Sequence, residues 1–161
     1  MTTPAQNALW KRLDSSSAEL ERCVVNAVNI CAHVAALGVD QIRRDAKNGK
    51  THGYRAEYGT APALVEAAHA ALWVAIANAA QVIREARPLS ATSGWNSKFQ
   101  DAHGSAANAV GLLRALEGAS GSLSGQCDVT RVSEHAVWLV DGAAGYGGWR
   151  APMDKNNTLH L

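Results

Sequence analysis

Hydrophobic residues recur at helical spacing in four long stretches of the chain, residues 16–37, 60–87, 97–117 and 128–145. At about 100° per residue, the apolar positions of each stretch fall on one side of a helix. The second stretch is rich in alanine, has no internal glycine, and carries its only proline in the first turn, which excludes a strand there. The four apolar stripes are Leu20, Val24, Ala27, Cys31 and Val34; Leu64, Ala68, Ala71, Leu72, Ala75, Ala79 and Val82; Phe99, Ala102, Ala106, Val110 and Leu113; and Val129, Val132, Ala136, Val140 and Ala143.

Capping residues, glycines and prolines mark the predicted ends of these long helices. A capping box, in which Ser or Thr is followed three residues later by Glu or Gln, predicts one start at Ser16 and another at Ser97. Thr60 and Asp128 are N-cap residues that predict the two other starts. The predicted stops are Gly38, Pro88, Gly118 and the glycines among residues 142–145.

Two shorter helices are predicted as well. Residues 3–6 form a capping box with proline at the first helical position, which predicts a short N-terminal helix that ends near Leu13. Asp40 can cap a short basic helix over residues 41–47, and the Asn-Gly pair at 48–49 ends it.

Together these elements predict an all-α fold, specifically an antiparallel up-down four-helix bundle, because short connections make successive helices antiparallel. The bundle would carry the short N-terminal helix, and a short helix plus a long loop between its first and second long helices. A chain of 161 residues that is 47% hydrophobic can bury one core, so we expect a single domain over residues 1–161. Residues 146–161 are expected to form an extended C-terminal tail.

Charge and targeting signals narrow the possible functions. The 15 Lys and Arg residues nearly balance the 14 Asp and Glu residues, so the net charge of +1 gives no field that would gather nucleic acid or anionic lipid. The N-terminus has no signal-peptide pattern, and no run reaches the roughly 18 apolar residues that a membrane helix needs. We therefore expect a cytoplasmic protein without a membrane contact and consider nucleic-acid binding unlikely.

One histidine falls in each long helix, which raises the possibility of a metal site. His33 lies on the polar side of its helix, His69 lies away from the apolar stripe, and His103 and His135 lie at stripe boundaries. Bundle metal sites take a Glu-x-x-His pair from each of two helices, whereas this chain has one such pair, Glu66 and His69, and no His-x-x-x-His pair. We predict no bound metal and no cofactor, with these histidines solvated or at the boundary of the core.

No catalytic arrangement passes its spacing test. The Gly-Lys-Thr sequence at 49–51 resembles the end of a phosphate-binding loop, but that motif needs glycine at position 44, where this chain has Arg44. Ser133, Glu134 and His135 are adjacent in a predicted helix, so their side chains point about 100° apart and cannot act on one another. The sequence therefore predicts no catalytic residue.

The connector at residues 48–59 is about twice the usual length, and long loops in compact domains are often functional. It places basic groups among tyrosines, a combination that suits an anionic ligand. The alternative is a simple crossover whose charges face water. The candidate ligand-binding residues are Lys50, His52, Tyr54, Arg55 and Tyr58.

Trp73 and Trp138 point away from the apolar stripes of their helices, which predicts a second covered surface. We therefore favour a non-enzymatic protein that acts through protein–protein contacts, most simply as a homodimer. One alternative is a small enzyme or ligand-binding bundle that uses the 48–59 loop. A weaker alternative is a nucleic-acid-binding regulator that uses Arg43, Arg44, Lys47, Lys50 and Arg55.

Overall fold

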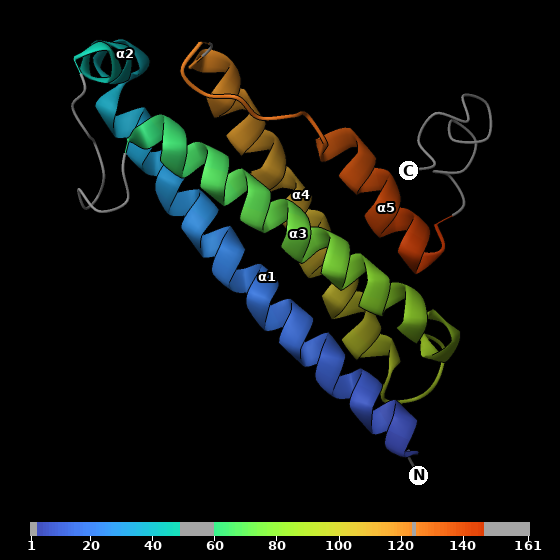
Figure 1. Ribbon diagram of the computed structural model, residues 1–161. Helices are drawn as coiled ribbons and strands as arrows, with labels where there is room; N and C mark the ends of the chain where they lie inside the picture. The colour runs from blue at the N-terminus through green and yellow to red at the C-terminus, as the bar shows by residue number, and fades with distance from the viewer. Residues whose placement is uncertain (1–2, 49–59, 124, 147–161) are drawn as a thin grey trace, which may run out of the picture.

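The computed structural model describes residues 3–48, 60–123 and 125–146, and these residues form helices and connecting segments without a β-strand (Figure 1). The predicted all-α fold is confirmed. The helices are α1 (Pro4–Leu37), α2 (Val39–Lys47), α3 (Ala61–Ala86), the short 3-10 helix η2 (Arg87–Leu89), α4 (Asn96–Ser122) and α5 (Ser133–Ala144).

The first helix is continuous over 34 residues, so the predicted short N-terminal helix and the break near Ser16 are wrong. The capping box at Thr3 does form, with Gln6 as its partner. The hydroxyl of Ser16, in contrast, donates to the carbonyl oxygen of Leu13 at 3.1 Å and caps nothing. Leu13 and Leu20 are both buried, so the core-facing stripe passes the serines without interruption and holds the helix together.

Helix α4 also departs from its predicted bounds. Ser97 lies inside the helix, and Trp95 takes the N-cap position without a side-chain cap. The ring of Trp95 instead packs edge-on against Trp10, with centroids 5.0 Å apart. At the other end, α4 continues past Gly118 to Ser122, since burial of Leu116 and Leu123 on both sides of the glycine outweighs its low helix propensity of about 1 kcal/mol.

The predicted fourth long helix is a helix of 12 residues, α5, which begins at Ser133 rather than after Asp128. The backbone N–H of Asp128 donates to the carboxylate of Glu66 at 2.7 Å, so a side chain of α3 holds the segment before α5. The first turn of α5 is capped by the carboxylate of Glu117 from α4, not by a residue of its own. Tertiary contacts, rather than a local cap, therefore set where this helix starts.

Contacts between the helix ends give the directions of the helices. Arg12 forms an ion pair of 2.6 Å with Glu85, which places the start of α1 beside the end of α3. Lys98 forms an ion pair with Asp14, which places the start of α4 beside the start of α1. Helix α3 is therefore antiparallel to α1, whereas α4 is parallel to α1. Helix α5 packs against α3 and α4 (Figure 1).

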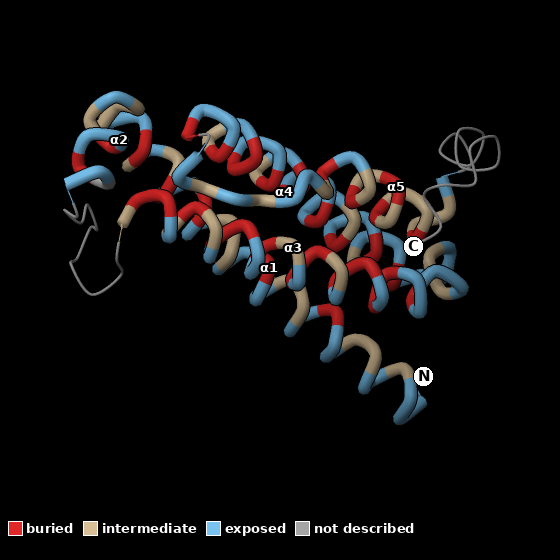
Figure 2. Tube along the Cα trace, turned by 45° about the horizontal axis from the view of Figure 1, so that its top comes forward, coloured by how far each residue is buried: buried red, intermediate tan, exposed pale blue. Residues whose placement is uncertain are grey.

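The core lies between the three long helices and is rich in alanine, as the stripes predict. Figure 2 shows the buried positions of α1, α3 and α4 turned toward one another. The largest fully buried side chains are Leu13, Leu20, Ile42, Leu72, Ile76, Ile83, Leu113, Leu116, Leu123, Val65 and Val140. Between them, alanines of α3 allow the neighbouring helices to approach closely.

By length and composition, two segments could cross a membrane, α1 and the stretch Ala61–Leu89, which contradicts the expectation that no stretch is apolar enough. Their most apolar 18-residue windows have mean hydropathies of 1.3 and 1.4. Only 28% of the α1 window is buried in the structure, against 44% of the other. A core helix of a soluble protein passes the same test, so this observation is weak support for a membrane contact.

Candidate functional site

The loop residues predicted to bind a ligand, Lys50, His52, Tyr54, Arg55 and Tyr58, lie outside the described residues. Their role stays a prediction.

The outward orientation predicted for the two tryptophans is wrong for Trp138, which is only 5% exposed. Trp73 is half-buried, and its ring lies beside His135 with the centroids 5.8 Å apart. Helix α5 thus covers the side of α3 that carries Trp73. The surface that the sequence assigned to a partner is largely covered within the chain itself.

The four helical histidines do not converge on one point. His69 is buried at 7% exposure, so its predicted position at or near the surface is wrong. His103 pairs with Asp141, and His135 is half-buried against Trp73. Over the described ranges, no three His, Cys, Asp or Glu side chains lie close enough together to hold a metal ion.

The most buried polar cluster joins α3, α4 and α5 through the carboxylate of Glu117. Its Oε2 lies 2.9 Å from Nε2 of His69 and accepts the backbone N–H groups of Val132 and Ser133 at 3.0 and 3.1 Å. Its Oε1 accepts the hydroxyl of Ser133 at 2.7 Å. A negative carboxylate at the N-terminus of a helix is also favoured by the helix dipole.

Burial alone would raise the pKa of Glu117, but the hydrogen bonds from His69, Ser133 and the backbone of Val132 outweigh it and hold the pKa below its ordinary value. The carboxylate therefore stays ionised at neutral pH. A nucleophilic triad needs histidine between the acid and the serine, whereas here the carboxylate stands between the other two groups. The arrangement leaves Ser133 without a base, so the cluster holds three helices together and does not activate a nucleophile.

A second pair, His103 and Asp141, fastens the end of α5 to the start of α4. Nε2 of His103 lies 2.9 Å from Oδ1 of Asp141, and both side chains are less than a fifth exposed. The ring of Tyr146 covers the imidazole at a centroid distance of 4.8 Å. In the described part of the chain, no serine, threonine or cysteine hydroxyl or thiol bonds to His103, so nothing there would use it as a base.

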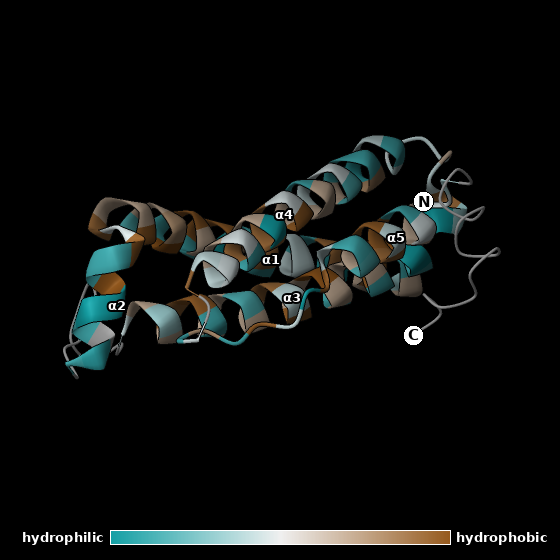
Figure 3. Ribbon diagram, turned by 90° about the horizontal axis from the view of Figure 1, so that it is seen from above, coloured by the Kyte–Doolittle hydropathy of each residue, from teal (hydrophilic) through white to brown (hydrophobic). Residues whose placement is uncertain are grey.

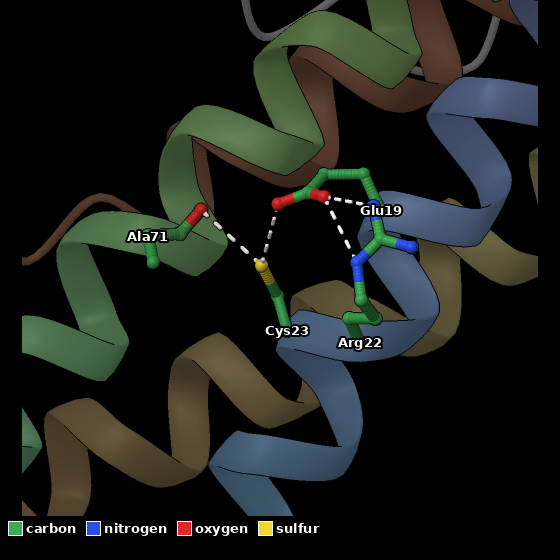
Figure 4. Close-up of polar contacts among 4 residues, drawn as sticks. All are labelled: Glu19, Arg22, Cys23 and Ala71. Atoms are coloured by element: carbon green, nitrogen blue, oxygen red, sulfur yellow. Dashed lines mark hydrogen bonds and ion pairs between the residues drawn. The ribbon is translucent and has the colours of Figure 1, made fainter.

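The three cysteines, Cys23, Cys31 and Cys127, are free thiols and half-buried. Figure 4 shows Cys23 at the edge between α1 and α3, where its Sγ lies 3.8 Å from Oε1 of Glu19 and 3.8 Å from the carbonyl oxygen of Ala71. Burial raises the pKa of the Cys23 thiol, and the neighbouring carboxylate of Glu19 raises it further. Because the thiolate is the reactive form, this environment suppresses nucleophilic chemistry.

Helix α1 exposes two large apolar side chains in neighbouring turns, and α3 exposes one, Val74. Val25 is 54% exposed and Val28 is 47% exposed, and Ala32 and Ala35 continue the same stripe at helical spacing. We call these four residues the outer face of α1. From Cys23 to Val39 the chain has no Asp, Glu, Lys or Arg, and Figure 3 shows the part of α1 next to α2 as mostly hydrophobic.

One apolar stripe per helix does not predict this face, because it accounts only for the side of α1 that is turned to the core. The signal that could have revealed it is the absence of charged residues over 17 positions, Cys23–Val39, most of which lie in a helix whose core stripe occupies only one side. Solvated helix faces usually carry charged residues, so an uncharged one marks a contact surface.

None of the protein-family models, curated proteins or solved structures that were compared with this chain matches it.

Proposed function

We propose that this protein is a non-enzymatic helical protein that acts by associating with a second copy of itself through the outer face of α1. The observation that carries this proposal is the exposed, uncharged stripe of Val25, Val28, Ala32 and Ala35. An exposed valine pair on such a surface gains free energy when a partner removes it from water, at roughly 25 cal/mol per Å² of apolar area.

A second copy suits this face better than a charged partner. In a two-fold symmetric contact the same surface serves both chains, and pairing α1 antiparallel about a point midway between Val28 and Ala32 would set Val28 opposite Ala32 and Val25 opposite Ala35 of the second copy. Burying an uncharged face costs no ion desolvation, and the alanines let two helix backbones approach closely. The net charge of +1 adds almost no repulsion between the copies.

We also propose the bundle topology and the cellular location that the sequence predicts. Helices α1, α3 and α4 are then the three long members of an up-down bundle, and α5 is a short fourth member. The protein would be cytoplasmic, without metal or cofactor. The buried polar groups support a structural role, since Glu117, His69 and Ser133 are engaged with one another and hold helices together.

Sedimentation equilibrium at micromolar concentration tests the proposal. The wild-type protein is expected at twice the chain mass of 16.9 kDa, and Val28→Glu is expected to be monomeric with unchanged helicity. Val74→Glu is the matched control, because Val74 is 57% exposed but lies on α3, outside the outer face. A wild-type protein that stays monomeric would refute self-association. Flotation of that monomer with lipid vesicles, lost in Val28→Glu, would assign the face to a membrane.

A further inference from the structure

A second surface feature is an open pocket of about 420 Å³ between α2 and the segment that leads from α4 to α5. Among the described residues its lining consists of Arg43, Arg44, Lys47 and Gln126, which form the wall mainly with the apolar parts of their side chains, and none of these four carries a carboxylate. Pockets that hold small ligands commonly have volumes of roughly 300–1,000 Å³.

The short helix α2 is held so that its cations face outward. Ile42 is fully buried and fixes the helix against the rest of the structure. Arg43 donates from Nη2 to the carbonyl oxygen of Ser122 at 2.8 Å, which anchors one guanidinium to the last turn of α4. The pocket is therefore built from two segments that are far apart in the sequence.

The acidic groups of α2 do not occupy the pocket. Asp45 is only 4% exposed and accepts a hydrogen bond of 2.8 Å from the side-chain amide of Gln41. Asp40 stands in the first turn of α2, away from the three cations in its second half. The positive charge at the pocket is thus left available to a ligand.

We propose that this pocket binds a small phosphorylated molecule. A guanidinium carries five N–H donors. Arg43 and Arg44 each use one of these donors in a hydrogen bond to the protein, and that of Arg44 goes to the side chain of Gln41 at 2.7 Å. The remaining donors of the two arginines and the ammonium of Lys47 match the oxygens of a phosphate group. The amide of Gln126 supplies a neutral donor and acceptor for the rest of the ligand.

A purely structural role would explain part of this pattern. Basic residues in the last turn of a helix stabilise the helix dipole, and Arg44 and Lys47 occupy that turn of α2. Such a role does not account for Arg43 and Gln126 at the same pocket. Ligand binding therefore has to be measured separately from stability.

Titration calorimetry with pyrophosphate as the probe tests the proposal on the full chain. The double substitution Arg44→Gln and Lys47→Gln is expected to weaken binding by at least about tenfold, because it removes two charged partners of the phosphate. The substitution pair Lys11→Gln and Arg114→Gln removes the same charge from exposed sites outside the pocket and should leave binding unchanged. Circular dichroism checks that both proteins keep their helicity.

Two further experiments test whether the interaction is electrostatic and whether the ligand is a small phosphorylated molecule or a nucleic acid. Raising the salt concentration from about 20 to about 200 mM should weaken wild-type binding, because exposed charges are screened. A single-stranded oligonucleotide that binds in a way that depends on Arg44 and Lys47, when pyrophosphate neither binds nor displaces it, would overturn the proposal in favour of nucleic-acid binding. An absence of pyrophosphate binding at low salt, or equal losses in the two double variants, would also refute it.

Discussion

Glu117 shows how one residue can join three helices. Its carboxylate receives groups from His69 of α3 and from the start of α5 while its own backbone belongs to α4. Local sequence gives no sign of this, since the partners stand 48 and 16 residues away. From the sequence alone, Glu117 is only the last residue before a predicted helix stop, and His69 lies off the apolar stripe. The burial of Glu117 depends on how α5 packs over α3 and α4.

We predict that Glu117→Gln destabilises the fold by about 2–4 kcal/mol, because an amide cannot accept all four hydrogen bonds and leaves buried donors unpaired. Urea unfolding followed by circular dichroism at neutral pH measures the loss. Glu21→Gln on the exposed side of α1 is the control and should change the free energy of unfolding by less than about 0.5 kcal/mol. Equal effects of the two substitutions would contradict the role assigned to Glu117.

The same residue predicts a pH dependence. Because the pKa of Glu117 in the folded state lies below its ordinary value of 4.5, folding favours the ionised form. Its contribution to stability is fully present above that value and is lost as pH falls through the folded pKa. The difference in unfolding free energy between wild type and Glu117→Gln should therefore shrink between about pH 7 and about pH 3. The exposed carboxylates titrate in both proteins and cancel, so a constant difference would rule out this linkage.

At the scale of elements, helix content could be predicted from the sequence and several helix boundaries could not. Thr3, Thr60 and Gly38 act as the sequence predicts, because their effects are local to the turn that they cap or end. Ser16 and Ser97 carry the same capping pattern and cap nothing. A capping box stabilises a helix start by about 1 kcal/mol, which is less than the burial of one leucine that a continuous helix achieves.

The continuity of α1 gives a test by proline substitution. In two separate helices capped at Ser16, Ser17 would be the first helical position, where proline is well tolerated. In the continuous helix, proline at position 17 removes a hydrogen bond and clashes with the carbonyl of Leu13, at a cost of about 3 kcal/mol or more. We expect Ser17→Pro to show that loss in urea unfolding, with Ser17→Ala close to wild type. A stable Ser17→Pro protein would restore the two-helix interpretation.

At the scale of the whole molecule, close packing of alanine-rich helices follows from the stripes, whereas the position of the contact surface does not. Trp73 and Trp138 suggested an uncovered side of α3 and the fourth helix, but α5 packs so that Trp138 is buried and Trp73 half-buried. That packing leaves the outer face of α1 as an uncharged exposed surface. A helical wheel shows which residues leave the core, but it cannot show which of them a distant segment covers.

Self-association also predicts that thermal stability depends on protein concentration. A dimer that unfolds to separate chains gains about 2.7 kcal/mol when concentration rises a hundredfold, which is shared between two chains. For a chain of this size that should raise Tm by about 3 to 5 °C. Circular dichroism melts at about 2 and about 200 µM should show this rise for the wild type and for Val74→Glu. Val28→Glu should melt at one temperature at both concentrations, because its chains unfold independently. The same concentration dependence in all three proteins would show that the chains associate through a surface other than the outer face of α1.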